Sequence, residues 1–479
     1  REARDRVFTA IRHLGRRSEP ANIVINLAPA DQRKEGAVLD LPIAVAILAT
    51  TGDLPRAVLR GRILIGELSL EGRLQPVRGV LPIVLAARDR GLDEVVVPAA
   101  NRAEADVVPG IEVVGAATLA EVVRYLRDGV APADNALAGP DPRSVAAACF
   151  DLSDVVGQEQ ARRALEVAAA GGHHLLLMGP PGSGKSMLAR RLPGILPPMN
   201  SDEAIETTCV YSVSTRVPRP QGLLAKRPFR APHHTTSPAA VIGGGTLPQP
   251  GEVSLANHGV LFLDELTEFR RDVLEAMRQP LEDRQVTVAR AHSTLTFPAR
   301  FQLVAAANPC PCGYLGDARR ECTCTPHSVQ KYRARLSGPL LDRIDLQIGV
   351  PAVPWRELSA NRRGELSSVV AARVERARSV QSDRYGGERL GSNGEMGPDA
   401  IRRWAQPDAD GRRLLDHASR GLGLSARAYH RILRVARTIA DLARDEVISA
   451  SHLAEAIAYR SLDRDPSARQ TVDGEWGAK

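Results

Sequence analysis

The chain has 479 residues, 43% apolar and 25% charged, which is typical of soluble globular proteins with about two to four domains. No apolar run reaches the ~18 residues of a membrane span, and residues 1–20 carry no apolar signal core, so we expect a cytoplasmic protein. The net charge of +7 is compatible with a nucleic-acid partner. However, almost all basic residues are Arg and they are spread along the chain, so charge alone does not select DNA.

The first part of the chain alternates strand and helix patterns. The chain begins at Arg1, without Met, inside a helix-like pattern, so we expect the natural N-terminus to lie upstream. The alternation over residues 1–128 predicts a separate α/β domain. The predicted strands are 21–28, 63–70, 72–76 and 94–98, and the predicted helices are 41–49, 81–90 and 117–126.

Two phrases in this part resemble the Lon-protease-type domain, which has a ribosomal-protein-like fold. They are LIGELSLEGRLQPVRGV (64–80) and LAARDRGLDEVVVPAANRAE (85–104). The resemblance places Val38 where a peptidase carries its nucleophilic Ser, and residues 80–83, which contain no Lys, where it carries its Lys. A nucleophile needs an activating base, and neither group is present. We therefore predict a non-proteolytic scaffold, followed by a linker at 129–150 that is rich in Ala, Pro and Gly.

Residues 179–186 (GPPGSGKS) match the phosphate-loop spacing G-x-x-x-x-G-K-[ST] at every fixed position. An apolar run at 175–178 precedes the loop and a helix-compatible run at 187–192 follows it, which is the context that phosphate binding requires. We expect Lys185 to reach the β- and γ-phosphates of ATP and Ser186 to bind Mg²⁺. The residues predicted to contact the nucleotide are Gly179, Pro180, Pro181, Gly182, Ser183, Gly184, Lys185 and Ser186.

Two later apolar strands end in polar residues that suit ATP hydrolysis. The strand at 259–263 ends in Asp264, placed to hold the Mg²⁺ water shell, and Glu265, placed to polarise the attacking water as a general base. The strand at 301–307 ends at Asn308, the sensor position of AAA+ ATPases, where a polar group helps to place that water. Residues 154–158 (DVVGQ) resemble the AAA+ segment that brackets adenine, which implies that Val156 and Gly157 contact the base.

The phrase SGPLLDRIDL (337–346) resembles the arginine-finger phrase of the magnesium-chelatase and minichromosome-maintenance branches, which makes Arg343 the candidate finger. Fingers are normally donated across a subunit boundary, so the resemblance implies an oligomer. In the helical region that follows, Arg427 matches the second-sensor arginine, acting either in cis or in trans. The predicted lid helices are 357–381, 399–404, 411–419, 425–443 and 449–460.

Two insertions match the pore-facing insertions of that clade. The first spans 211–245, and the second is a predicted hairpin at 286–297. Basic side chains there would grip a phosphate backbone independently of sequence. RNA or protein substrates would also use them, and pairing with local carboxylates is the other interpretation. The candidate DNA contacts are Lys226, Arg227 and Arg230 in the first insertion and Arg290 and His292 in the second.

Four of the six cysteines lie close together in the sequence, as Cys310-Pro-Cys312 and Cys322-Thr-Cys324, with His327 nearby. Four thiolates at such a range can close a tetrahedral Zn²⁺ site. The spacing differs from the C-x₂-C of common zinc fingers, so a solvent-facing loop of inert or redox-active thiols is the alternative.

Over almost its full length the chain resembles the ComM (YifB) family of magnesium-chelatase-like AAA+ ATPases. The phrases that carry this resemblance are RPFRAPHHTTSPAAVIGGG (227–245), ANPCPCGYLGD (307–317) and LSARAYHRILRVARTIADL (424–442). The resemblance implies an α/β fold. Its parts are an inactive Lon-type domain (1–128), a linker (129–150), an AAA+ P-loop core with a parallel sheet (151–353), a helical lid (354–465) and a tail (466–479).

The family resemblance also implies a function. It implies a hexameric ring that uses ATP and Mg²⁺ to drive branch migration of three-stranded or Holliday-type DNA during natural transformation. Two other classes share the core: a magnesium-chelatase motor subunit and a protein-remodelling ring. Chelatase motors lack the Lon-type front domain, and the absent Ser and Lys argue against a peptidase but not against protein remodelling.

Overall fold

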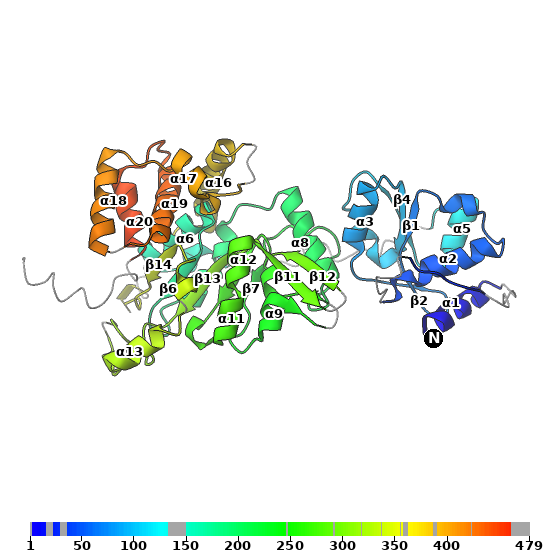
Figure 1. Cartoon of the computed structure of the whole chain (residues 1–479), viewed down its shortest axis with the longest axis horizontal. Helices are drawn as coiled ribbons and strands as arrows, with labels where there is room; N and C mark the ends of the chain where they lie inside the picture. The colour runs from blue at the N-terminus through cyan, green and yellow to red at the C-terminus, as the bar shows by residue number, and fades with distance from the viewer. Residues whose placement is uncertain are drawn as a thin grey trace, which may run out of the picture.

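The computed structural model describes residues 2–15, 23–28, 36–132, 150–245, 248–290, 293–317, 319–336, 338–354, 356–357, 363–386, 390–422 and 424–460. Figure 1 shows an elongated chain in which an N-terminal α/β unit, a parallel-sheet core and a group of C-terminal helices follow one another. The predicted fold class, α/β with a parallel-sheet P-loop core and a helical lid, is confirmed. The predicted tail, 466–479, lies outside the described residues.

The N-terminal unit is built on a three-stranded parallel sheet with the order β1-β4-β5. Leucine, valine and alanine side chains of α1, α2, β4 and α5 form a core on the sheet, and Val80, Leu81 and Val84 of α3 join a second one. The strands are β1 (Arg62–Leu64), β4 (Glu94–Pro98) and β5 (Glu112–Ala116), beside a ribbon of β2 (Glu67–Leu68) and β3 (Leu74–Gln75). The helices are α1 (Glu2–His13), α2 (Asp40–Thr50), α3 (Val80–Asp89), α4 (Arg102–Ala105) and α5 (Leu119–Asp128).

Two strand predictions in this unit are wrong. Of the strand predicted at 21–28, residues 23–28 belong to no strand and Val24 is 92% exposed, because among the described residues no strand lies alongside to pair with them. The run at 63–70 is split into β1 and β2 at Gly66, where a Cβ would lie 3.4 Å from the side chain of Leu41. Apolar alternation alone therefore overpredicted strands in this unit.

The core contains a five-stranded parallel sheet with the order β14-β6-β13-β10-β7. Strands β6, β10 and β13 are buried along their whole length, as their apolar sequences predict for a sheet covered on both faces. All five run in the same direction, so their carboxyl ends form one edge of the sheet and their amino ends form the opposite edge. The strands are β6 (Leu175–Met178), β7 (Phe229–Arg230), β10 (Val260–Leu263), β13 (Gln302–Ala307) and β14 (Leu346–Gly349).

Short helices and turns surround this sheet (Figure 1). Gln158 takes a left-handed conformation and begins α6 (Glu159–Gly171), whose alanine-rich face packs against the sheet. The helix predicted after the phosphate loop, at 187–192, is α7, which ends earlier, at Ala189. The other helices are α7 (Lys185–Ala189), α8 (Ser201–Val213), α9 (Pro238–Ile242), α10 (Glu252–Leu255), α11 (Arg271–Ala276), α12 (Arg278–Asp283), α13 (Pro326–Arg333) and α14 (Gly338–Leu341).

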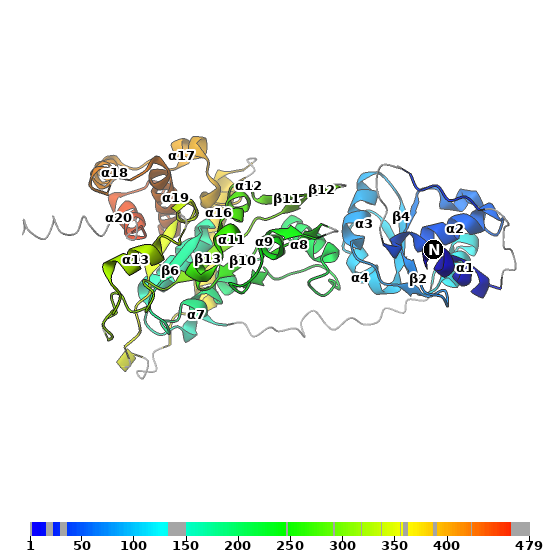
Figure 2. The same ribbon diagram turned by 60° about the horizontal axis from the view of Figure 1, so that its bottom comes forward.

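The predicted second insertion is a β-hairpin, which confirms the alternating pattern read at 286–297. Strands β11 (Gln285–Arg290) and β12 (Ser293–Pro298) pair antiparallel, from Gln285 opposite Pro298 to Arg290 opposite Ser293. The hairpin runs outward along the core towards the N-terminal unit (Figure 2). Its two tip residues, 291 and 292, lie outside the described residues. The first insertion ends at the two-residue strand β8 (Gly243–Gly244), which contacts β11 and pairs with β9 (Gln249–Pro250), just beyond the insertion.

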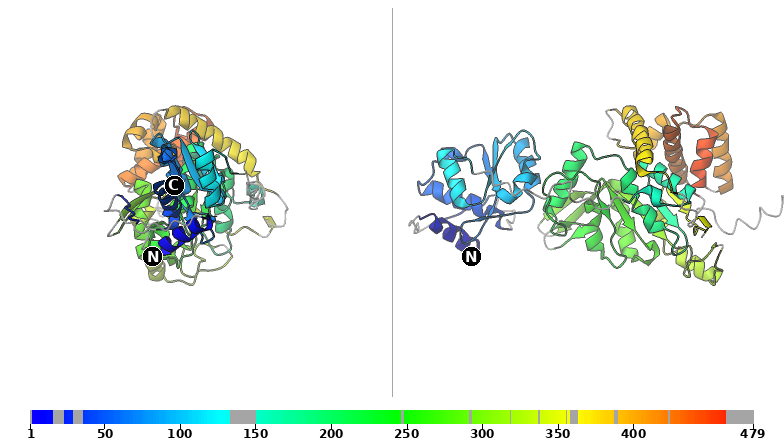
Figure 3. Two further views of the ribbon diagram at one scale, coloured as in Figure 1. Left: turned by 90° about the vertical axis from the view of Figure 1, so that its right-hand side faces the viewer. Right: turned by 180° about the vertical axis from the view of Figure 1, so that it is seen from behind.

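The C-terminal helices form a group on one side of the sheet core (Figures 1 and 3). The helix predicted at 357–381 is interrupted: residues 356–357 are helical, residues 363–366 are not, and α16 begins at Ser367. In the gap, Gly364 passes so close to the core that a Cβ would lie 2.7 Å from the carbonyl oxygen of Val155. Among the described helices, none is both long and apolar enough to cross a bilayer. The helices are α16 (Ser367–Arg384), α17 (Pro398–Trp404), α18 (Ala409–Leu422), α19 (Ala426–Ala443) and α20 (Ala450–Ala458).

The N-terminal unit contacts the core through α3 and α8 (Figure 1). The backbone N–H of Gly79 donates to the carbonyl of Ser212 at 3.0 Å, and Arg78 donates to the carbonyl of Val217 at 3.1 Å. The buried carboxylate of Glu104 accepts from the hydroxyl of Ser212. The contact therefore falls on the end of α8, where the first insertion begins.

Candidate nucleotide site

The phosphate-loop lysine is held inside the loop. Lys185 Nζ donates hydrogen bonds to the carbonyls of Gly179 (2.7 Å) and Pro180 (2.9 Å) and to Asn308 Oδ1 (3.2 Å). Burial lowers the pKa of this ammonium, and the carboxylates of Asp264 and Glu265 partly oppose that effect. A cation held this way can exchange neutral carbonyls for phosphate oxygens.

The loop needs glycine at defined positions. Gly184 has φ 87°, a left-handed value that places the start of α7 behind the loop. At Gly179, a Cβ would lie 2.1 Å from the carbonyl oxygen of Val350. The chain can therefore leave β6 beside the end of β14 only without a side chain at this position. In glycine-rich loops of this kind, backbone N–H groups can face phosphate oxygens.

Ser186 and Asp264 meet at the carboxyl edge of the sheet. Ser186 Oγ donates to Asp264 Oδ2 at 2.6 Å, although the two residues follow different strands, β6 and β10. A hydroxyl and a carboxylate are oxygen donors of the kind that Mg²⁺ prefers. This pair fits a magnesium ion, which would be held between the two side chains.

Glu265 stands beside this pair and faces solvent. It has φ 53°, its backbone N–H donates to Asp264 Oδ1 at 3.0 Å, and its side chain is 57% exposed. Its Oε2 lies 3.2 Å from Nδ1 of His234. His234, whose ring centroid lies 4.1 Å from that of His233, was not among the predicted site residues. The signal for it was the pair of adjacent histidines that follows β7 in the first insertion.

The predicted adenine segment lies behind the loop. Gln158 Nε2 donates to the carbonyl of Ser183 at 2.5 Å, which ties this segment to the phosphate loop. Val156 and Gly157 line a cavity of about 720 Å³ whose wall also includes Glu357. A Cβ at Gly157 would lie 2.6 Å from Glu357 Oε2, so the segment is closely covered on that side. Adenine contact by Val156 and Gly157 stays a prediction.

Arg343 and Arg427 lie together at the opposite edge of the sheet. Arg343 precedes β14, pairs with Glu282 of α12, and its side chain is 13% exposed. Arg427 is in the first turn of α19, 68% exposed, with Nη1 4.0 Å from Asp342 Oδ2. Both line a cleft of about 650 Å³ between the sheet and the C-terminal helices.

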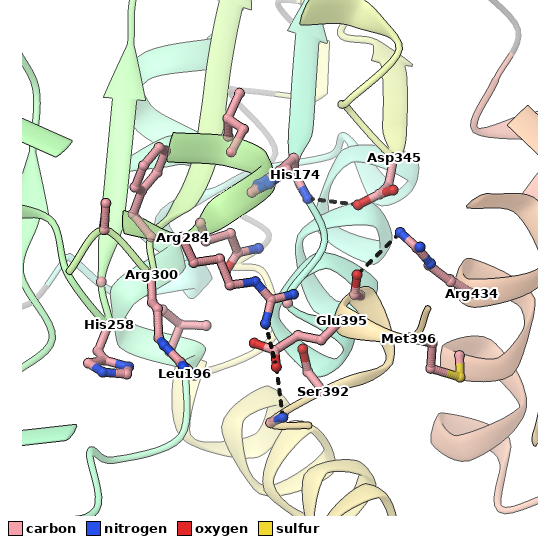
Figure 4. Close-up of a pocket in the computed structure, with 18 of the residues that line it drawn as sticks. His174, Leu196, His258, Arg284, Arg300, Asp345, Ser392, Glu395, Met396 and Arg434 are labelled. Carbon is pink, nitrogen blue, oxygen red and sulfur yellow. Dashed lines mark hydrogen bonds and ion pairs between the residues drawn. The ribbon is translucent and has the colours of Figure 1, made fainter. Parts of the chain in front are cut away.

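This cleft is rich in arginine and is closed by ion pairs between the core and the C-terminal helices (Figure 4). Arg431 of α19 donates to Asp345 Oδ1 at 3.0 Å, and Arg284 Nη1 lies 2.7 Å from Glu395 Oε2. His174 Nδ1 accepts a hydrogen bond from the N–H of Leu303 at 3.0 Å. Burial lowers the pKa of His174 to about 4. The cleft thus fixes α19, with Arg427, against the segment that carries Arg343.

The candidate DNA contacts differ in their surroundings. Arg227 pairs with Glu203 at 2.8 Å and Arg230 with Glu252 at 2.7 Å, so both side chains are engaged within the core. Lys226 is exposed. Arg290 ends strand β11 at the tip of the hairpin, and His292 lies outside the described residues.

The four clustered cysteines meet in space. Their sulfur atoms all lie within 4.8 Å of one another, and His327, at the start of α13, is not a member of the group. A hydrogen bond from the backbone of Tyr314 lowers the pKa of the Cys312 thiol. This loop follows directly after Asn308.

Comparisons with known proteins agree with this arrangement. Residues 151–358 match the family described as magnesium chelatase, subunit ChlI, residues 364–460 match its C-terminal family, and residues 1–101 match a third family, subunit ChlI of Mg-chelatase. Competence protein ComM of Haemophilus influenzae is 44% identical over 468 residues, 97% of this chain and 90% of that protein. The uncharacterized protein YifB of Escherichia coli is 43% identical over the same share of both chains. The magnesium-chelatase 38 kDa subunit of Cereibacter sphaeroides is 28% identical over 179 residues, 33% of this chain and 53% of that subunit.

Proposed function

Because this chain belongs to the ComM/YifB family of magnesium-chelatase-like AAA+ proteins, we propose that it is an ATP-hydrolysing ring motor that acts on DNA. The most specific form of the proposal is a cytoplasmic, hexameric branch-migration helicase that works in natural transformation. The name of the ComM relative, a competence protein, supports that setting.

One observation supports assembly into a ring: Lys185 and Arg343 lie at opposite edges of one sheet. Strands β6 and β14 pair in parallel, from Leu175 opposite Leu346 to Met178 opposite Gly349. Lys185 comes after this paired stretch and Arg343 before it, so at ~3.3 Å per residue the strands alone separate them by roughly 10 Å. This separation supports the proposal that Arg343 serves the nucleotide of a neighbouring chain, as head-to-tail contacts in a closed ring would allow.

Arg427 supports the same assembly. It lies beside Asp342, next to Arg343, rather than beside the phosphate loop of its own chain. We propose that Arg427 acts in trans together with Arg343. The ion pair of Asp345 with Arg431, one helical turn after Arg427, keeps both arginines on one rigid face.

The residues at the carboxyl edge have separate tasks. Lys185 neutralises phosphate charge, and Ser186 and Asp264 hold Mg²⁺, which when bound polarises the phosphate oxygens. Glu265 accepts a proton from the attacking water, and Asn308 orients that water from the next strand. Exposure of Glu265 to solvent suits this task, because water reaches it without a conformational change.

DNA contact rests on the hairpin and the exposed part of the first insertion. Arg290 and His292 at the hairpin tip, with Lys226, would bind the phosphate backbone in the central channel of the ring. Arg227 and Arg230 would have to leave Glu203 and Glu252 to join them, so we assign them a smaller share.

The experiment is a steady-state ATPase assay with single-stranded DNA, forked DNA or an unfolded protein as the added partner. We expect stimulation by DNA and DNA binding that weakens steeply with salt. The double variant Arg290→Ala, His292→Ala should lose most of both. Arg413→Ala is the matched control, because Arg413 is an exposed arginine on α18, far from the hairpin in Figure 1.

The outcomes separate the alternatives. Stimulation by unfolded protein alone would replace the DNA motor with a protein-remodelling ring. ATPase activity with no response to DNA, and no DNA binding at low salt, would overturn the DNA assignment and leave a chelatase-type motor as the explanation for the similarity of the core.

A further inference from the structure

The cysteine loop after Asn308 has a geometry that its sequence spacing did not predict. Cys310 Sγ lies 3.3 Å from Cys312 Sγ and 3.7 Å from Cys322 Sγ, and Cys312 Sγ lies 3.5 Å from Cys322 Sγ. Cys324 completes the group, whose four sulfur atoms lie within 4.8 Å of one another. With Zn–S bonds of about 2.3 Å, tetrahedral geometry places sulfur atoms about 3.8 Å apart. We propose that these four cysteines bind one Zn²⁺ ion, and that the loaded loop supports the nucleotide site.

Backbone N–H groups point at three of the sulfur atoms. Leu315 N–H donates to Cys310 Sγ at 3.3 Å, Cys312 N–H to Cys324 Sγ at 3.4 Å and Cys324 N–H to Cys322 Sγ at 3.5 Å. Four thiolates around one divalent ion carry a net negative charge, and N–H donors of this kind stabilise it. The fold therefore provides both the ligands and their surrounding hydrogen bonds.

The other chemistries of clustered cysteines fit less well. The sulfur atoms of Cys310, Cys312 and Cys322 lie 3.3 to 3.7 Å apart with no bonded pair among them, whereas two disulfides would separate the four sulfurs into two close pairs. An iron–sulfur cluster spreads its thiolates around several iron atoms, which requires wider separations than these. One small ion shared by all four sulfurs matches the compact group.

The loop lies against the phosphate loop. Gly313 has φ 86°, and a Cβ on it would lie 2.6 Å from Pro181 Cδ. Cys310 is two residues after Asn308, whose side chain accepts a hydrogen bond from Lys185. A metal that fixes Cys310 and Cys312 therefore also fixes Gly313 against the phosphate loop, and Asn308 against Lys185.

Beyond Cys324, the cysteine loop leads into α13, which contacts the segment that follows Asp264 and Glu265 at the end of β10. Cys324 precedes Thr325, which caps α13 by accepting a hydrogen bond from the backbone of Ser328. At the other end of α13, Tyr332 accepts a hydrogen bond from Thr267, two residues after Glu265, at 2.6 Å. The proposed ion thus lies in a loop that joins the Asn308 strand end to the segment following Glu265.

The metal half of the proposal is tested without nucleotide. Full-length protein purified under reducing conditions is analysed for metals, and zinc release is followed during thiol titration with a mercurial. We expect about one zinc per chain, lost in Cys312→Ser and Cys322→Ser and retained in Cys209→Ser, because Cys209 lies in α8, outside the group. If the serine variants do not fold, cobalt(II) added to wild-type protein stripped of metal should give the absorption bands of tetrahedral thiolate coordination. Zinc well below one per chain after supplementation, iron in its place, or disulfide-linked thiols would each overturn the site.

The second part of the proposal, that the zinc-loaded loop supports the nucleotide site, rests on the proposed ATPase function. It is tested by nucleotide binding and by ATPase activity. Removing zinc from the wild-type protein should weaken binding of a fluorescent ATP analogue and lower kcat/KM by about tenfold or more, and reloading should restore both. Gly313→Ala should keep its zinc and still lose nucleotide affinity, because the new methyl group pushes on Pro181. Unchanged nucleotide binding after zinc removal overturns the coupling. Zinc-loaded protein without any ATPase activity overturns the proposed function instead.

Discussion

Glu265 Oε2 lies 3.2 Å from Nδ1 of His234, so the first insertion touches the acidic strand end at the side chain proposed as the general base. His234 also packs edge-on against Phe269, with ring centroids 6.4 Å apart, which fixes its orientation. The insertion is proposed to contact DNA and Glu265 is proposed as the general base, so a movement of the insertion would reach that side chain through this contact. We infer that the contact couples DNA binding to the nucleotide site.

Breaking the contact between His234 and Glu265 should uncouple ATP hydrolysis from DNA binding. We expect His234→Ala to keep basal ATPase activity within about threefold of wild type and to lose most of its stimulation by DNA, because Glu265 no longer follows the insertion. The measurement is the ratio of ATPase rates with and without DNA. Thr235→Ala is the control, since Thr235 is exposed and bonds His233 rather than Glu265. Full DNA stimulation in His234→Ala would show that the coupling runs through other residues.

Replacing Glu265, the proposed general base, should lower ATP hydrolysis itself rather than its stimulation by DNA. Glu265→Gln keeps the shape of the side chain but cannot accept the proton, so kcat should fall by about 10²–10⁴ while ATP affinity is retained. Glu268→Gln changes a nearby carboxylate that pairs with Arg335 at 3.6 Å, and it should hydrolyse ATP normally. Nucleotide binding and single-turnover hydrolysis distinguish the two variants. Near-normal hydrolysis by Glu265→Gln would assign the base to another residue.

The sequence was sufficient for residues whose position depends on a local strand–loop pattern. Asp264 and Asn308 directly follow apolar strands, and Lys185 lies at the end of the loop that follows β6. Parallel pairing of those strands brings their ends to one edge of the sheet. The hairpin was visible for the same reason, since alternation over two short runs fixes antiparallel pairing.

Features that depend on distant contacts were not predictable. His234 reaches Glu265 only because the first insertion folds back over the strand end. Before α16, Gly364 approaches Val155 closely, which no propensity encodes. Spacing alone left the cysteines undecided between metal and free thiols, because C-x-C pairs say nothing about the distance between the two pairs.

A mixing experiment tests whether each nucleotide site is built from two chains. Arg343→Ala should bind ATP and lose turnover by about 10³ or more, as expected for loss of an arginine finger. Glu265→Gln is inactive for a different reason. In mixed rings, a site with the intact Glu265 of one chain and the intact Arg343 of its neighbour is complete, so equal mixing should restore about a quarter of wild-type activity if sites act independently.

The control for the mixing experiment uses two variants whose defects both lie in the chain that supplies the phosphate loop and Glu265 to a site. Lys185→Ala mixed with Glu265→Gln should restore nothing, because every site contains one of the two defects whichever chain supplies Arg343. Activity in that mixture, or none in the first, would contradict an Arg343 shared between chains.

We predict that the stability of the fold depends on pH through His174, which lines the cleft between the sheet and the C-terminal helices. His174 is kept neutral there: burial, with the cations Arg431 and Arg284, lowers its pKa to about 4 despite Asp345. In the unfolded chain the same imidazole takes up its proton near its ordinary pKa of about 6.5, so the unfolded state binds more protons between these two values. Stability should therefore fall as the pH drops from about 6.5 to about 4, by at most about 3 kcal/mol, because part of the ring surface is open to the cleft.

Urea-unfolding midpoints at pH 7.5 and pH 5 measure this effect. His174→Gln should show a smaller loss at pH 5 than wild type, because glutamine can still accept the hydrogen bond of the Leu303 N–H but does not titrate. His417→Gln is the control: His417 is exposed on α18, and the variant should keep the wild-type pH dependence. An equal loss of stability in His174→Gln and wild type would mean that other groups in the cleft, rather than this histidine, take up the proton on unfolding.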